Sequence, residues 1–325
     1  MQEVFSLQRK MSNNVTPVLL MTGHWIEILG WWALGAAVGS WLWVVVVFII
    51  AGKFRQLQEL SHFGVHRSLC RSARVGDALI EFGAHAPLAL QTVSARRRTH
   101  VREHHPAATI SGRDPNLADL ERVGLTPGCT TLGFILALFY PLSPWGLAWT
   151  CKQIVSNLWS ANSPWWRPPI FLGACTLSYL IAGWPGIVFS FLLPRLLVYP
   201  QLSWLSLLVE HRWFDAAIPR SRRPLEVESS RCQRLYLRHP ALAIVAKIYW
   251  LPYGDLFHFT HSVHPAVRWS YLPAVERVVG LPQGGAETVL LGRYSAVRML
   301  YESTRAFRAL PTPVFGADRR ARLAR

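Results

Sequence analysis

Histidines gather in four short segments of the chain, with a spacing that suits metal binding. Nine of the twelve histidines belong to these segments: His62, His66, His100, His104, His105, His211, His258, His261 and His264. Residues four apart share a helix face, so the two imidazoles of such a pair point the same way. Imidazole nitrogens bind iron, zinc and copper. One pair would be a weak signal, but four segments together predict a site for two metals.

A zinc hydrolase is the main alternative, and the details argue against it. A zincin helix carries His-Glu-x-x-His with the Glu as general base, whereas Phe63 follows His62 here. Zinc sites are almost always four-coordinate, so more than six imidazoles exceed what one zinc accepts. The five cysteines form no CxxC pair, which argues against a zinc ribbon or an iron–sulfur site.

Two acidic residues are expected to support the metal ligands. Ligating histidines usually donate their other N–H to a carboxylate or a carbonyl. Glu210 directly precedes His211, and Asp255 lies three residues before His258. We predict that both carboxylates lie beside the metal site without being its main ligands.

Composition indicates that a membrane positions these segments. Hydrophobic residues make up 51% of the 325-residue chain, whereas charged residues make up only 16%; soluble domains carry about a quarter charged residues. A spanning helix needs about 20 mostly apolar residues. Apolar stretches run over residues 17–52, which we expect to form a hairpin turning at 35–40, and over 129–150 and 169–209, while 75–95 suits a surface or re-entrant segment.

This organisation predicts an all-α integral membrane protein with about four transmembrane helices. The histidine segments then reach one side of the membrane and form a helical cytosolic cap. Residues 1–310 are expected to form a single domain, and 311–325 a disordered basic tail. The net charge of +16 fits basic loops on the cytosolic side and the binding of membrane lipid, so nucleic acid is not an expected partner.

The four segments resemble the histidine boxes of the membrane fatty acid desaturase and hydroxylase superfamily. His62 and His66 match its HxxxH box, His100, His104 and His105 its HxxxHH box, and His258 and His261 its last HxxHH box. Glu210-His211 matches a further histidine often preceded by Glu, and Asp114-Pro115-Asn116 resembles the turn after the second box. The resemblance covers about residues 40 to 280.

The last box departs from the family pattern. Ser262 stands where the second histidine of the HH pair is expected, and an additional histidine occurs at His264. Three interpretations follow: His264 replaces the missing ligand, one iron has fewer ligands, or metal binding is weakened and the chemistry altered. Because His264 precedes Pro265, it is disfavoured in a helix and could turn back toward the site.

The resemblance implies a non-haem di-iron oxidoreductase that uses O2 to attack an unactivated C–H bond. Its two irons would be the cofactors, and an apolar tunnel would hold a fatty-acyl or lipid-like substrate. The sequence has no flavin, nicotinamide or cytochrome b5 motif, so a separate electron donor of ferredoxin or cytochrome b5 type is expected. Desaturation is the leading prediction. Hydroxylation or another oxidation of a carrier-bound or specialised lipid is the alternative, and a non-enzymatic metal-binding or transport protein is a third reading.

Overall fold

The computed structural model is helical, apart from isolated β-bridges such as His211–Cys232. It describes residues 2–39, 41–216, 223–237, 239–279, 286–289, 292 and 294–306. The predicted all-α class is therefore confirmed for this part of the chain. The predicted basic tail at 311–325 lies outside the described residues.

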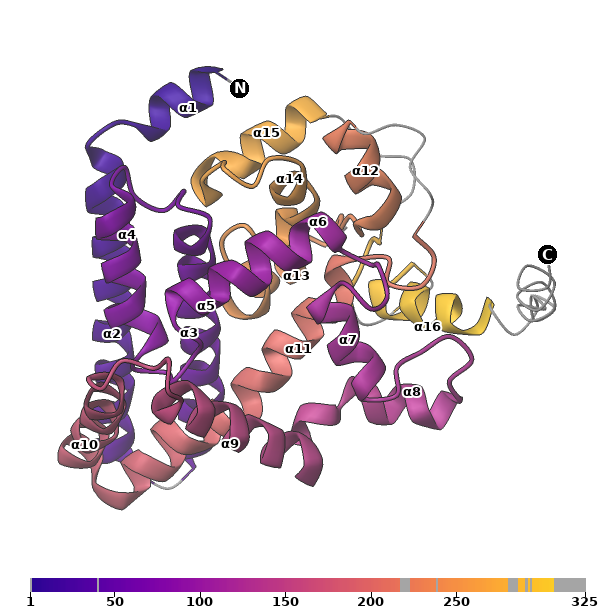
Figure 1. Ribbon diagram of the computed structural model, residues 1–325. Coiled ribbons are helices and arrows are strands. Elements are labelled where there is room, and N and C mark those ends of the chain that lie inside the picture. The colour runs from indigo at the N-terminus through magenta and orange to yellow at the C-terminus, as the bar shows by residue number, and fades with distance from the viewer. Residues whose placement is uncertain are drawn as a thin grey trace, which may run out of the picture.

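The first apolar region forms a helical hairpin, as the sequence predicted. Its arms, α2 (Ser12–Val38) and α3 (Leu42–Val65), pack side by side at one edge of the molecule (Figure 1). Gly39 closes α2 at φ 67°, a conformation that favours glycine. Gly35 allows the close approach, because a Cβ there would lie 2.6 Å from the Trp43 ring. The last turn of α3 carries the first pair of histidines.

The apolar stretch 169–209 forms a second hairpin instead of one span. Its first arm belongs to α10 (Arg167–Pro185), in which Gly183 is non-helical with φ 64°. The second arm runs through the π-helical segments η4 (Gly186–Leu192) and η5 (Pro194–Val198) into α11 (Tyr199–Glu210). The two arms pack against each other and against the first hairpin. Trp32 of α2, fully buried, donates from Nε1 to the Ser190 carbonyl over 3.0 Å.

The expected number of membrane spans is not shown. Among the described residues, Arg167–Glu210 is the one helical stretch that is long and apolar enough to cross a membrane. The stretch 129–150 is divided into α8 (Thr131–Leu138), the 3-10 turn η3 (Tyr140–Leu142) and α9 (Pro144–Trp159). Ser143 ends the turn and caps α9 by accepting from the Gly146 amide over 3.1 Å. The chain therefore bends in the middle of its third apolar run.

The stretch 75–95 is also broken, in line with its prediction as a non-spanning segment. It contains α4 (Ala73–Ile80), the π-helical η1 (Glu81–His85) and the start of α5 (Val93–Arg97). Arg167, fully buried at the start of α10, pairs with Glu81 and donates to the carbonyls of His85 and Leu90. These bonds fix the segment that leads into the second histidine segment.

The remaining helices surround the histidines. On the N-terminal side these are α1 (Gln2–Gln8), the π-helical η2 (Arg98–His104), α6 (His105–Ala107) and α7 (Pro115–Arg122). On the C-terminal side they are α12 (Pro224–Arg231), α13 (Pro240–Val245), η6 (Ala246–Trp250), η7 (Asp255–Phe257), α14 (His258–Val263), η8 (Trp269–Tyr271), α15 (Leu272–Val279) and α16 (Ala296–Ala306). Figure 1 shows α5, α6 and α14 meeting above α11.

The buried His85 predicts how stability depends on pH. Its Nδ1 lies 2.6 Å from the Gln91 carbonyl and its Nε2 lies 3.0 Å from the Ser61 hydroxyl. Burial lowers the pKa of His85 from 6.5 to about 3, so the folded protein favours its neutral form. Its contribution to stability is complete above pH 6.5 and is lost as the pH falls from there toward 3.

We therefore expect the melting temperature of His85→Gln to fall less steeply below pH 6.5 than that of the wild type. Thermal melts of both proteins between pH 4 and 8 measure this effect. Because the other histidines are the same in both proteins, the difference between the two curves reports on His85. Parallel curves for the two proteins would contradict the assignment.

Candidate metal centre

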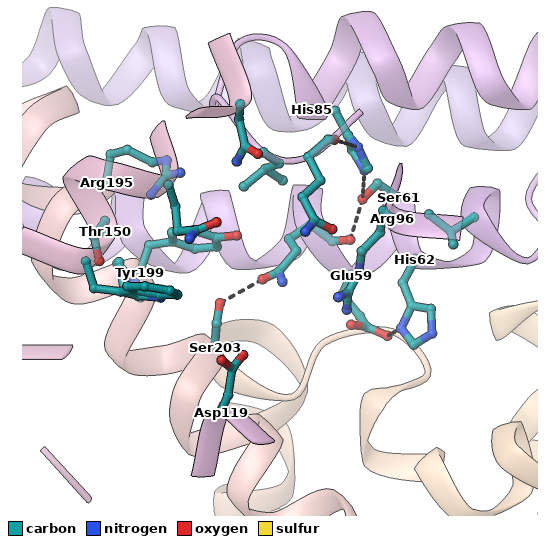
Figure 2. A pocket seen from close by; sticks show the side chains of 18 residues that line it. Glu59, Ser61, His62, His85, Arg96, Asp119, Thr150, Arg195, Tyr199 and Ser203 are labelled. Carbon is teal, nitrogen blue, oxygen red and sulfur yellow. Dashed lines mark hydrogen bonds and ion pairs between the residues drawn. The ribbon is translucent and has the colours of Figure 1, made fainter. Parts of the chain in front are cut away.

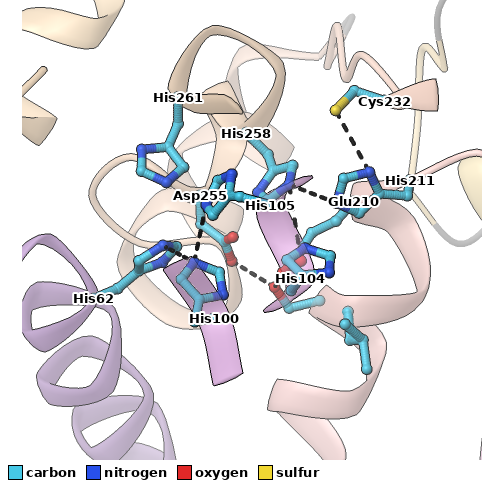
Figure 3. A network of polar contacts seen from close by, with 12 residues as sticks. His62, His100, His104, His105, Glu210, His211, Cys232, Asp255, His258 and His261 are labelled. Atoms are coloured by element: carbon cyan, nitrogen blue, oxygen red, sulfur yellow. Dashed lines mark hydrogen bonds and ion pairs between the residues drawn. The ribbon is translucent and has the colours of Figure 1, made fainter. Parts of the chain in front are cut away.

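Five histidines from distant segments converge on one point. The Nε2 atom of His66 lies 3.1 Å from that of His62 and 3.2 Å from those of His105 and His261. The Nε2 atom of His100 lies 2.7 Å from that of His62. The first group is therefore His62, His66, His100, His105 and His261. These histidines lie on α3 and its C-terminal cap, and on η2, α6 and α14. Figure 3 shows His62, His100, His105 and His261.

The π-helix η2 divides the second histidine segment between two groups. The sequence predicted that His100 and His104 share a face, as residues four apart do in an α-helix. In η2 the His105 amide instead donates to the His100 carbonyl, five residues back. The Nε2 atoms of His100 and His105 accordingly lie 3.2 Å apart, while His104 turns toward His211, with ring centroids 5.0 Å apart.

A second group lies next to the first. Nε2 of His211 lies 3.1 Å from Nε2 of His258, and the Cys232 thiol is the third possible ligand of this group. The His104 ring lies at the edge of the group, with its centroid 5.0 Å from that of His211. His258 and His261 are three residues apart on α14, yet they belong to different groups, with ring centroids 6.0 Å apart. Both η2 and α14 therefore contribute to both groups, which places the two groups side by side, as Figure 3 shows.

The hydrogen bonds of two rings leave their Nε2 lone pairs free for a metal. Nδ1 of His62 lies 3.0 Å from a Glu59 carboxylate oxygen, and Nδ1 of His104 lies 2.8 Å from Asp114. A carboxylate accepts, so these Nδ1 atoms carry the proton. Nε2 of His104 is buried and has no hydrogen-bond partner among the described residues. Adjacent nitrogens bound to one metal at about 2.1 Å lie roughly 3 Å apart. The spacings in the first group and between His211 and His258 fit this value.

The electrostatics also favour neutral imidazole, the form that binds metals. Burial is the main cause, and the neighbouring histidines add to it. Burial lowers the pKa of His258 to about 3. It lowers the pKa well below the ordinary value for His66, His100, His105, His211 and His261. These six rings therefore stay neutral, with a lone pair available, in the physiological pH range.

The two acids predicted from the sequence lie beside the second group. A Glu210 oxygen lies 4.0 Å from Nε2 of His258, and one oxygen each from Glu210 and Asp255 lies within 4.8 Å of a ring nitrogen of His258. Asp255 accepts hydrogen bonds from Arg55 and from Ser206, the latter over 2.6 Å. Burial raises the pKa of Asp255 to about 6, against the effect of the Arg55 charge.

The carboxylates that hold the rings are different ones, Glu59 and Asp114. Glu59 stands three residues before His62 on α3. Residues three apart on a helix are neighbours, so this spacing could have identified Glu59 from the sequence. Asp114 was visible as the start of the Asp-Pro-Asn turn. It caps α7 by accepting from the Asn116 amide over 2.9 Å and also accepts from the Thr109 amide over 2.9 Å. Asp114 is 1% exposed, so this turn links the second histidine segment to α7.

We expect Asp114→Asn to weaken metal binding at the second group. An amide oxygen is uncharged and accepts from His104 Nδ1 more weakly than a carboxylate does, and the amide nitrogen cannot accept from the Thr109 amide as the second carboxylate oxygen does. Weakening such a partner typically costs 10- to 100-fold in metal affinity. Titration of the apoprotein with Fe²⁺ measures the change. Asp215→Asn, at an exposed acid paired with Arg212, is the matched control. Equal affinities for the two variants would contradict the role of Asp114.

The structure does not bring His264 into either group. It ends α14, with its backbone N–H donating to the carbonyls of Thr260 and His261. Ser262 is buried beside Cys232, whose thiol lies 3.5 Å from Nδ1 of His211. His264 as a replacement ligand therefore stays a prediction. In this arrangement the second group contains fewer imidazoles than the first.

Comparison with known proteins agrees with this geometry. No curated protein matches the chain significantly. The family model "Fatty acid desaturase" matches residues 39–284. That range contains both histidine groups, helix α3 of the first hairpin and the whole second hairpin. It covers more than half of the chain. The chain therefore belongs to the fatty acid desaturase family.

Proposed function

We propose that this protein is a membrane di-iron oxidoreductase that uses O2 and external electrons to oxidise a C–H bond. The convergence of imidazole nitrogens from four distant segments into two adjoining groups carries the proposal. The first iron would be held by the five histidines of the first group. The second would be held by His104, His211 and His258, with Glu210 and Asp255 beside them.

The residues around the histidines would hold the ligands in place and keep water away from the irons. The irons, when bound, supply O2 activation and the removal of hydrogen from an unactivated carbon. Glu59 and Asp114 hold His62 and His104 in the tautomer with a free Nε2. Burial of the rings excludes water and so limits side reactions of a reactive site. Ser206 and Arg55 hold Asp255 in place.

A membrane location is supported by the surface of the hairpins. Large apolar side chains are exposed along α2, α3 and α10, and they include Leu19, Ile26, Val44, Phe48, Leu172 and Leu180. Apolar surface of this extent is what a bilayer covers. Exposed arginines lie beside the first two histidine segments, namely Arg67, Arg71, Arg74, Arg98 and Arg102. Under the positive-inside rule they support a cytosolic position for the metal centre.

The same arginines suit docking of an acidic electron donor. Electrostatic steering speeds association between oppositely charged surfaces. A ferredoxin or a cytochrome b5 type protein would supply the two electrons. Membrane lipid headgroups are the other negatively charged surface that this face would meet.

Two reactions are candidates. Desaturation of a fatty-acyl or lipid-like chain is the first, since it follows from the family. Hydroxylation or a related oxidation of a specialised or carrier-bound substrate is the second.

Elemental analysis of the detergent-purified protein, together with O2 uptake in the presence of reductant, tests the proposal. We expect two irons per chain, a sharp loss of iron in His104→Ala, and O2 consumption only when both iron and reductant are present. A single zinc ion unaffected by His104→Ala, with no O2 uptake, would overturn the oxidoreductase and leave the metal-binding or transport alternative.

A further inference from the structure

Helix α13 and the π-helical η6 together form a continuous apolar segment, residues 240–250, on the surface of the protein. Of these residues only Ala246 is buried. The large apolar side chains that are more than half exposed are Leu242, Ile244, Val245 and Ile248. Apolar surface gathered in this way is unfavourable in water, so a bilayer or a partner is expected to cover it.

Segment 240–250 is held beside the middle of helix α3. Its second half, η6, packs directly against α3. Gly52 allows this contact, because a Cβ at that position would lie 2.5 Å from the Tyr249 ring. One turn further along α3, the side-chain amide of Gln56 donates to the Ile248 carbonyl. The apolar segment therefore has a fixed position relative to the first hairpin.

Gly52 and Gln56 belong to a stripe of residues four apart that runs along one face of α3. The two earlier members of this stripe, Val44 and Phe48, are 61% and 52% exposed. They are part of the apolar surface through which the hairpin would contact lipid. Segment 240–250 covers the next two members. Its own apolar surface therefore adjoins the surface that a bilayer would cover.

The polar end of α3 begins beyond this contact. There Glu59 and His62 line a cavity of about 300 Å³ at the metal centre (Figure 2). At about 1.5 Å of rise per residue, Gly52 lies roughly 6 Å from Phe48 and roughly 15 Å from His62 along the helix axis. The segment therefore lies between the apolar part of the hairpin and the metal centre, at the depth where a membrane surface is expected.

The length and the polar residues of the segment also suit the membrane interface. As an α-helix, residues 240–250 would be about 16 Å long, too short to cross a hydrocarbon core of about 30 Å. No acidic residue occurs between His239 and Trp250, whereas Lys247 is exposed. A lysine side chain extends from apolar surface toward lipid headgroups. Tyr249 and Trp250 are of the residue types that are enriched at membrane interfaces.

We propose that segment 240–250 inserts into the leaflet on the side of the metal centre, with its exposed apolar side chains among the lipid acyl chains. A bilayer is favoured over a protein partner because the segment adjoins the exposed apolar stripe of α3. The chain continues from Trp250 through the buried Leu251 to Asp255 and His258. Insertion would therefore hold the last histidine segment close to the membrane surface. The inference rests on the membrane location in the proposed function and adds a site of lipid contact next to the metal centre.

Photo-crosslinking of the full-length protein in dioleoylphosphatidylcholine vesicles tests this inference. Ile244→p-benzoylphenylalanine places a photoreactive side chain on the exposed face of α13. The same substitution at Leu172, on the exposed apolar surface of α10, is the positive control. At Val278, which is 87% exposed on α15, it is the control outside the membrane, since Figure 1 shows α15 and α10 at opposite ends of the molecule.

We expect mass spectrometry to detect lipid adducts at positions 244 and 172 after irradiation, and none at position 278. A bilayer around segment 240–250 places acyl C–H bonds next to the photoreactive group, whereas water does not react with it productively. An adduct of position 244 with a second copy of the protein, or with another segment of the same chain, would overturn the proposal. So would the absence of any adduct at position 244.

Charged substitutions test whether apolar contact holds the segment in the lipid. Leu242→Asp with Ile248→Asp should reduce the lipid adduct at position 244 roughly tenfold or more, since burial of one such side chain corresponds to about that factor in an equilibrium. Leu225→Asp with Val278→Asp, at exposed apolar residues of α12 and α15, is the matched control. Unchanged iron content and melting temperature in detergent show that both double variants are folded. An unchanged adduct yield in Leu242→Asp with Ile248→Asp would overturn the insertion.

The two control positions separate this inference from the proposed function. Adducts at position 172 without adducts at 244 would contradict only the inserted segment. Adducts at neither position would contradict the membrane location and the inserted segment together. Protein without iron that still forms the adduct at 244 would contradict the di-iron function and support the lipid contact of segment 240–250.

Discussion

His66→Ala is expected to lose at least one iron per chain and to abolish O2-dependent turnover. Nε2 of His66 lies within 3.2 Å of the same atom in His62, His105 and His261, so no other ring contacts as many members of the first group. Its removal leaves a gap in the middle of the ligand set. Elemental analysis and O2 uptake of the purified variant measure both effects.

Two further histidine variants make this result specific. His239→Ala, which removes an exposed histidine outside both groups, should keep the iron content and turnover of the wild type. His264→Ala distinguishes the interpretations of the last histidine segment. Retention of both irons would show that the ligand missing at Ser262 is not replaced by His264, whereas loss of one would show that it is. Full iron content in His66→Ala would contradict the first group as a metal site.

Arg55→Met is expected to destabilise the protein more than any surface substitution. Arg55 is 2% exposed and pairs with Glu59 and Asp255, which are 4% and 3% exposed. Removing the cation leaves two buried carboxylates without their partner, and breaking such a buried pair typically costs about 3–5 kcal/mol. Chemical denaturation followed by intrinsic tryptophan fluorescence measures the loss.

The pH dependence of this loss identifies its cause. The pKa of Asp255 is already raised to about 6, and loss of the Arg55 charge raises it further. As the pH falls, the unpaired carboxylate takes up a proton and its burial no longer opposes folding. The deficit of Arg55→Met should therefore be smaller at pH 5 than at pH 8, and Arg55→Met with Asp255→Asn should recover part of it. A deficit that is independent of pH would indicate lost packing alone.

The chemistry of the site depends on the network behind the ligands. Arg55 connects Glu59, which holds His62 of the first group, with Asp255, which lies beside His258 of the second. The two metal positions therefore share one buried charge network. A change on either side would be transmitted to the other through Arg55, because each partner there is buried and satisfied by the others.

The sequence by itself determined the ligand types and the family. The spacing of four residues between His62 and His66 predicted that their imidazoles point the same way, and their Nε2 atoms lie 3.1 Å apart. His62 and His66 share a face of α3 as predicted, because that helix is regular up to Val65. The break in the chain between 75 and 95 was also visible, since Asp77, Glu81 and His85 interrupt its apolar pattern.

Only the tertiary structure decided how the histidines are divided. The π-helical backbone of η2 pairs His100 with His105 and frees His104 for the second group, and local sequence rules assume an α-helix at that place. The turn at Gly183 divides the apolar stretch 169–209, and the turn at Pro141 divides the stretch 129–150. Apolar composition alone does not show where such a stretch turns. The set of residues around the cavity beside His62 could not be predicted either. Gln58, Gln153 and Ser203 come from three separate helices, and only folding brings such residues around one cavity.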